Sequence, residues 1–166
     1  MFKIILFLLI FFNFNLTNAQ DKIAYLNLEF LIQNTISGKT ILKNIENINK
    51  KNLETFKKRE KKIRDTEQDL INKKNILSDQ EFQSNITDLK KSMDIFNSEK
   101  RKSNIDFEKK RKDLLDNYMV KIKPIIEEYI KLNSISVVIN KNHVVIANKK
   151  YDITFDLIKM IDEEIK

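Results

Sequence analysis

The side chains in this sequence that could do chemistry are few and scattered. His143 is the only histidine, and no Ser/His/Asp order or metal cluster accompanies it, so a structural role is favoured over a catalytic base. Glu127 and Glu128 are adjacent and point to different parts of a helix surface, whereas a general acid and base must converge. Gly38 precedes Lys39, but the spaced glycines of a phosphate-binding loop are absent. These patterns do not predict an enzyme, a cofactor or a metal.

The charge of the chain is basic and unevenly distributed. The formal net charge is +7, and residues 39–77 hold 12 basic and 6 acidic residues, against 12 and 11 in residues 78–133. A basic surface can attract nucleic acid, anionic lipid or acidic polypeptides. Only four of the 31 basic residues are arginine, which supplies the bidentate contacts that nucleic-acid recognition favours. We therefore expect no nucleic-acid partner, and solvated surface explains much of the lysine equally well.

Residues 1–19 have the features of a secretory signal peptide. Lys3 gives the positive start, residues 4–12 form an apolar run, and the segment ends in small residues at Ala19. The apolar run is shorter than the roughly 20 residues that a membrane-spanning helix needs. We therefore expect export and cleavage after Ala19.

Residues 39–123 are predicted to form a long helical hairpin. Apolar residues recur first at helical spacing and then every seven residues, which is typical of a coiled-coil seam. Ser78 and Glu81 can form a capping box, which places the tip of the hairpin near residues 75–82. The descending helix has a matching stripe. The seam residues are Ile41, Ile45, Ile48, Phe56, Ile63, Leu70 and Leu77 on the first helix, and Phe82, Ile86, Leu89, Met93 and Phe96 on the second.

Residues 20–38 and 124–166 are predicted to form a small β body at the base of this hairpin. Residues 22–28 form one strand, and residues 136–139 and 143–147 form a β-hairpin of β-branched residues. Pro124 should kink or restart the returning helix, and Thr154 should cap a final helix. The fold class is therefore α+β. Three short strands and one helix bury too little apolar surface, which predicts oligomerisation through the body.

The order of several short segments carries a resemblance to a known family. The mature chain opens on Lys22-Ile23-Ala24-Tyr25-Leu26-Asn27, and Ser37-Gly38-Lys39 precedes the long charged hairpin. Lys123-Pro124-Ile125, Val137-Val138-Ile139 and Asp152-Ile153-Thr154 then follow in order. Together they are similar to the Skp/OmpH family of periplasmic chaperones, over essentially the whole mature chain.

This resemblance implies a homotrimer whose helical hairpins surround a cavity like tentacles. There the family holds unfolded outer-membrane β-barrel proteins without ATP and delivers them to the outer membrane, and some members bind lipopolysaccharide. A structural coiled-coil spacer of the cell envelope is the alternative. The candidate trimer residues are Ile23, Tyr25, Leu26, Val137, Val138, Ile139 and Val145. The candidate client contacts are Ile63, Leu70, Leu77, Phe82, Ile86, Leu89, Met93 and Phe96.

Overall fold

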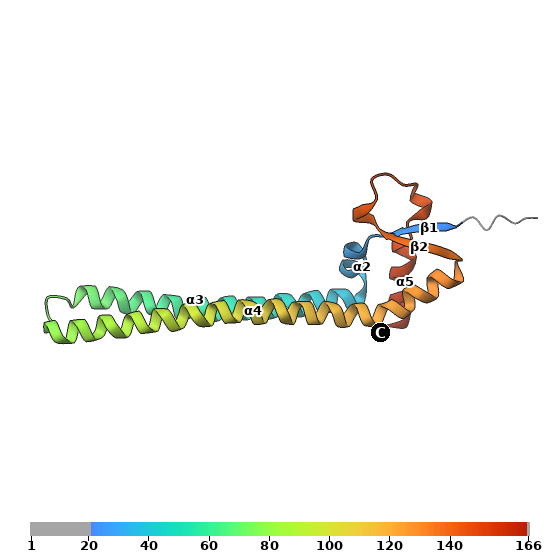
Figure 1. Cartoon of the computed structure of the whole chain (residues 1–166). Coiled ribbons are helices and arrows are strands. Elements are labelled where there is room, and N and C mark those ends of the chain that lie inside the picture. The colour runs from blue at the N-terminus through green and yellow to red at the C-terminus, as the bar shows by residue number, and fades with distance from the viewer. Residues whose placement is uncertain (1–20, 166) are drawn as a thin grey trace, which may run out of the picture.

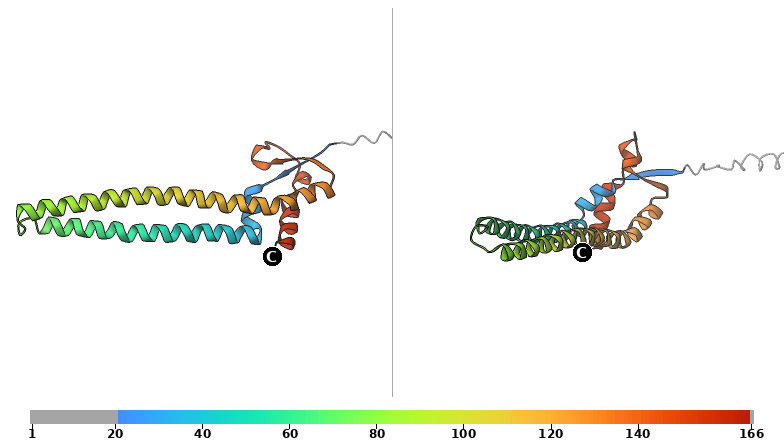
Figure 2. Two further views of the ribbon diagram at one scale, coloured as in Figure 1. Left: turned by 60° about the horizontal axis from the view of Figure 1, so that its bottom comes forward. Right: turned by 60° about the vertical axis from the view of Figure 1, so that its left-hand side comes forward.

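The computed structural model describes residues 21–165, so the expected signal peptide lies outside the described residues. Two long helices, α3 and α4, lie side by side and project as a rod from a small body (Figures 1 and 2). The elements in chain order are β1 (Lys22–Leu26), α2 (Leu28–Asn34), α3 (Ile36–Asn72), α4 (Asp79–Leu132), β2 (Ile135–Asn140) and α5 (Thr154–Glu164), with 3-10 turns at Lys141–His143 and Lys149–Tyr151. The expected long helical hairpin on a small body is confirmed.

The two arm helices pack through the predicted apolar seam. The rings of Phe56 on α3 and Phe96 on α4 meet edge to face, with centroids 5.9 Å apart. Arg59 forms an ion pair with Glu99 beside this contact. The 37 residues of α3 extend roughly 55 Å at the usual helical rise of about 1.5 Å per residue. The seam therefore holds a thin rod together with little core of its own.

The tip of the hairpin is closed by the predicted capping box. The Glu81 backbone N–H donates to Ser78 Oγ (3.4 Å), and the Ser78 backbone N–H donates to the Glu81 carboxylate (3.1 Å). The hydrogen bond from the Ser78 hydroxyl, followed by that from its N–H, lowers the pKa of Glu81. The sequence prediction of this capping box is confirmed, and it fixes where α4 begins.

Replacing Ser78 with alanine should loosen the tip without unfolding the arm. Loss of an N-cap side chain costs about 1 kcal/mol of helix stability. Amide hydrogen exchange should therefore accelerate in the first turn of α4, while the base of the arm stays protected. Ser84→Ala, at an exposed position further along α4, is the control. Equal exchange in both variants would show that the box does not hold the tip.

Of the two outcomes expected at Pro124, a kink or a restart of the helix, the restart does not occur. Helix α4 continues through Pro124 to Leu132. Proline has no N–H to donate to the carbonyl of Val120, but Val120 is 71% exposed, so water can reach that carbonyl. The last part of α4 turns away from α3 and leads into the body (Figure 1). Pro124 thus lies within one bent helix.

The body contains a two-stranded parallel sheet in place of the expected three strands. β1 pairs with β2 in the register Ile23↔Val137 and Tyr25↔Ile139. The predicted strand at residues 143–147 does not form. The Asn140 side chain accepts a hydrogen bond from the Asn142 N–H and a 3-10 turn follows, so the chain does not return along β2. The segment of residues 141–151 instead projects from the body (Figure 1).

The core of the body lies between the sheet, α2, α5 and the base of α4. Its fully buried apolar side chains are Leu31, Tyr118, Ile122, Leu157 and Ile161. The final helix forms as expected, but Thr154 does not cap it. Ile153 occupies the cap position without a side-chain bond, and Thr154 Oγ1 accepts from the Asn27 N–H at 2.9 Å. Thr154 therefore ties α5 to the segment that follows β1.

A cluster of polar contacts, buried at Thr35 and Tyr118, joins the arm to the body. Thr35, which is fully buried, lies between α2 and α3 and places its hydroxyl 2.6 Å from the Tyr118 hydroxyl on α4. The same Thr35 oxygen accepts from the Gly38 N–H at 3.2 Å. Asp162 of α5 accepts from the Ile36 N–H at 2.7 Å. Four helices thus meet at the start of α3.

Tyr129 gives this body a measurable sensitivity to high pH. Burial, reinforced by its hydrogen bond to Asp156 (2.9 Å), raises the pKa of Tyr129 from 10.0 to about 12. Because the neutral phenol is favoured by folding, this stabilisation is present below pH 10.0 and is lost as the pH rises to about 12. Tyr129→Phe should flatten the fall in unfolding midpoint over that interval. An unchanged profile would contradict this assignment.

Candidate functional site

The predicted client contacts lie mainly in the seam between α3 and α4. Leu70 and Phe96 are buried, with only 8% and 7% of their surface exposed. Met93 is 40% exposed. The remaining members are half-buried: Ile63, Leu77, Phe82, Ile86 and Leu89. These residues hold the hairpin together, so a bound chain could reach them only where the seam opens at its edge.

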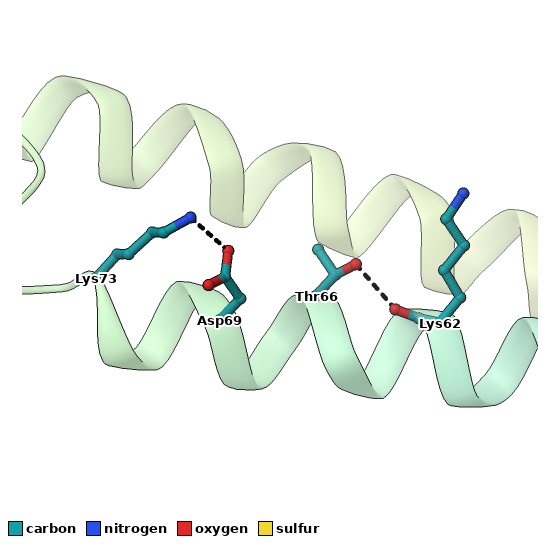
Figure 3. A network of polar contacts seen from close by, with 4 residues as sticks. All are labelled: Lys62, Thr66, Asp69 and Lys73. Carbon is teal, nitrogen blue, oxygen red and sulfur yellow. Dashed lines mark hydrogen bonds and ion pairs between the residues drawn. The ribbon is translucent and has the colours of Figure 1, made fainter.

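The seam opens along one side of the outer arm, in a groove of about 570 Å³. We call this side the grooved flank. Its floor contains Ile63, Leu70, Leu77 and Leu89, which are predicted client contacts. Its rims are Arg59, Lys62, Thr66 and Asp69 on α3 with Lys73 at the end of that helix, and Asn85, Asp88, Ser92 and Ile95 on α4. Side chains of the α3 rim, among them Asp69 and Lys62, are directed toward α4 (Figure 3).

Most of the polar side chains on the α3 rim have a partner within the same helical turn or the next. Lys73 forms an ion pair with Asp69 at 2.7 Å, and Thr66 donates to the Lys62 carbonyl at 2.9 Å (Figure 3). Within residues 21–165, the Lys62 amine forms no ion pair. The grooved flank therefore combines an apolar floor with one uncompensated positive charge.

The side of α3 that faces away from the groove is basic. Lys57, Lys61 and Arg64 lie together there, with Glu60 as the acidic neighbour. Glu60 pairs with Arg64 at 3.4 Å, and more than half of each side chain is exposed. Such an exposed pair contributes little to stability. This surface is a solvated one that could attract anions over a distance.

Several large apolar residues on the arm lie outside the predicted stripe. Ile95 is 55% exposed at the rim of the groove, and Ile71 is 58% exposed on the opposite side of α3. Others are exposed elsewhere along the arm: Leu53, Ile76 and Ile105. The heptad spacing places Leu53 on the seam, whereas the structure leaves it 63% exposed; the isoleucines lie off the seam, so the spacing does not identify them. Their signal in the sequence is an apolar residue at a helical position that the hairpin itself cannot cover.

The predicted trimer residues divide between the two faces of the sheet. Leu26 and Val138 face the core of the chain itself. The outer face carries Ile23 and Val137, each about half exposed, with Ile139 and Tyr25 beside them. Burial, with a contribution from Asp152, raises the pKa of Tyr25. This outer face is apolar and incompletely covered.

The projecting segment extends that apolar surface. Val145 and Ile146 are 96% and 92% exposed, and a groove of about 720 Å³ separates the segment from the sheet. Ile23, Tyr25 and Ile139 line this groove together with Ile146 and Tyr151. Parallel sheets are normally covered on both faces, and a two-stranded sheet is marginal alone. The surface therefore has the character of an interface.

The structure does not bring His143 together with acidic side chains into a metal-binding group within the described residues. Among residues 21–165, no three His, Asp or Glu side chains are placed to hold a metal ion. His143 is exposed in a 3-10 turn rather than in the expected strand. No helix in this range combines the length and hydropathy needed to cross a bilayer. The grooved flank and the apolar sheet face remain the candidate functional surfaces.

Comparisons with known proteins agree with this arrangement. A family model described as outer membrane protein (OmpH-like) matches residues 22–161. The fold resembles the crystal structure of a candidate OmpH-like outer membrane chaperone from Caulobacter crescentus, with a TM-score of 0.78 and 14% identity. The match covers 88% of this chain and 86% of that chain. No curated protein matches the sequence.

Proposed function

The chain belongs to the OmpH-like family of outer membrane proteins, and we therefore propose that it is a periplasmic holdase chaperone. It binds unfolded outer-membrane β-barrel proteins in a cavity between helical arms, prevents their aggregation and delivers them to the outer membrane. It does so without ATP. The observation that carries this proposal is the long paired arm, whose exposed apolar groove projects far from the body.

The surface that an unfolded β-barrel protein exposes suits an arm of this kind. An unfolded β-barrel protein exposes apolar faces and unpaired strand edges, which pair between molecules and aggregate. A thin arm with an open apolar groove offers many weak contacts instead of one deep pocket. Weak contacts hold the client without fixing one conformation, so release needs no nucleotide. The basic surface of the arm adds attraction for acidic clients and for anionic lipid or lipopolysaccharide surfaces.

The proposed active form is a homotrimer assembled through the body. Ile23, Val137 and Ile139 on the outer sheet face, and Val145 on the projecting segment, supply apolar area for contact between copies. Residues 20–38 and 124–166 are the proposed body, and residues 39–123 the proposed arm. Three arms then surround one space. Export to the periplasm rests on the signal peptide at residues 1–19, with cleavage after Ala19.

The test is light scattering of a urea-denatured outer-membrane β-barrel protein diluted into buffer with the purified mature chain and no nucleotide. The proposal predicts suppressed scattering that is weaker at high salt, because part of the capture is electrostatic. Denatured lysozyme, which is not a β-barrel, is the control client. If the client aggregates as before in the presence of a well-folded trimer, this result would contradict the holdase and favour the structural spacer.

A further inference from the structure

The two sides of the outer arm differ in chemistry. The grooved flank has an apolar floor that includes Leu70 and Leu89, with Ile95 exposed at its rim. The opposite side of α3 carries Lys57, Lys61 and Arg64, and Ile71 is exposed on that side nearer the tip. Residues 62, 66, 69 and 73 follow one helical stripe, and residue 71 is about half a turn from that stripe at 3.6 residues per turn. The arm is therefore two-sided.

On the basis of the proposed function, we infer that the grooved flank is the client-binding face of each arm. Its occupant is an extended client segment that carries apolar side chains and a carboxylate. The apolar side chains cover the floor and Ile95. The carboxylate pairs with the Lys62 amine, which has no partner of its own among the described residues.

The dimensions of the groove suit an extended segment. From Lys62 to Lys73 the α3 rim rises roughly 17 Å, and an extended chain rises about 3.3 Å per residue. About five client residues therefore lie along the groove. Asn85 and Ser92 on the α4 rim provide amide and hydroxyl groups for the client backbone. In a transmembrane β-barrel strand, every second side chain is apolar, so an extended segment of such a strand presents one apolar face to the floor of the groove.

Two isoleucines provide a matched test of this inference. Ile95→Lys changes the grooved flank, and Ile71→Lys makes the same change on the opposite side at nearly equal exposure. Burying an isoleucine against a client should tighten binding about tenfold or more. Ile95→Lys should therefore raise the client Kd at least tenfold, measured by fluorescence anisotropy with a labelled β-barrel protein. Ile71→Lys should leave the Kd within about twofold.

A second measurement locates the client directly. Because the chain contains no cysteine, Asn85→Cys on the grooved flank and Asn97→Cys on the opposite side of α4 each carry one environment-sensitive dye. The dye at position 85 should shift to the blue when client is added, and the dye at position 97 should not. A dye at position 85 that is already shifted in the client-free trimer would mean that a second arm covers the groove, which overturns the inference.

The outcomes separate this inference from the function on which it rests. Equal effects of Ile95→Lys and Ile71→Lys, with scattering still suppressed by the unmodified chain, would overturn the grooved flank as the binding face and leave the holdase intact. Failure of the unmodified chain to suppress scattering would overturn both. Circular dichroism of each variant confirms that the arm remains helical.

Discussion

Replacing Gly38 with alanine is expected to destabilise the chain by about 3 kcal/mol, because the added methyl group has no space. A Cβ at this position would lie 2.0 Å from the Ile32 carbonyl oxygen and 2.6 Å from Thr35 Oγ1. The nearest atom belongs to the backbone of α2, so a rotamer change cannot relieve the clash. The helix would have to separate from α2 and disturb the bond between Thr35 and Tyr118.

Intrinsic helix propensity alone would predict the opposite change in stability. In an exposed helix, Gly→Ala stabilises by about 1 kcal/mol. Urea denaturation should show a lower midpoint for Gly38→Ala than for the unmodified chain. Lys39→Ala, at the exposed position next to Gly38, is the control and should leave the midpoint nearly unchanged. A Gly38→Ala chain as stable as the original would show that α2 does not pack this closely on α3.

The second large effect is expected on assembly. The double variant Val145→Asp and Ile146→Asp should reduce the mass in solution from that of a trimer to that of one chain. Both side chains are more than 90% exposed in the single chain, so two carboxylates there do not disturb its core. In the proposed trimer they would bury two charges without partners, at a cost of several kcal/mol for each ion. Sedimentation equilibrium measures the mass.

A control in the same segment separates charge from position. Asn142→Asp with His143→Asp adds two carboxylates at exposed residues next to the apolar pair. That variant should stay trimeric, and both variants should keep the circular dichroism of the arm helices. A trimer that survives Val145→Asp and Ile146→Asp would place the interface elsewhere on the body.

The arm could be predicted from the sequence because its signals are local. Heptad spacing and the capping box at Ser78 and Glu81 act within a few residues, and both appear in the structure. The third strand could not be predicted correctly. Residues 143–147 have strand-forming side chains, but the Asn140 turn directs them away from β2, and β2 pairs instead with β1 from the other end of the chain.

The candidate surfaces were only partly visible in the sequence. The periodic stripe identified the groove floor but not its rim, because Ile95 and Lys62 lie off the seam and periodicity gives no reason to select them. The polar contacts at the base of the arm were also missed. Thr35 and Tyr118 are 83 residues apart, and no local pattern pairs them. A contact between residues so far apart in the sequence is determined by the packing of the whole body.

Native mass spectrometry can weigh the soluble complex that forms when a denatured outer-membrane β-barrel protein is diluted into the mature chain. If three arms enclose one client, one dominant species should contain three copies of the chain and one client. A client bound to a single chain, or recovered only free or aggregated beside an intact trimer, would contradict this enclosure.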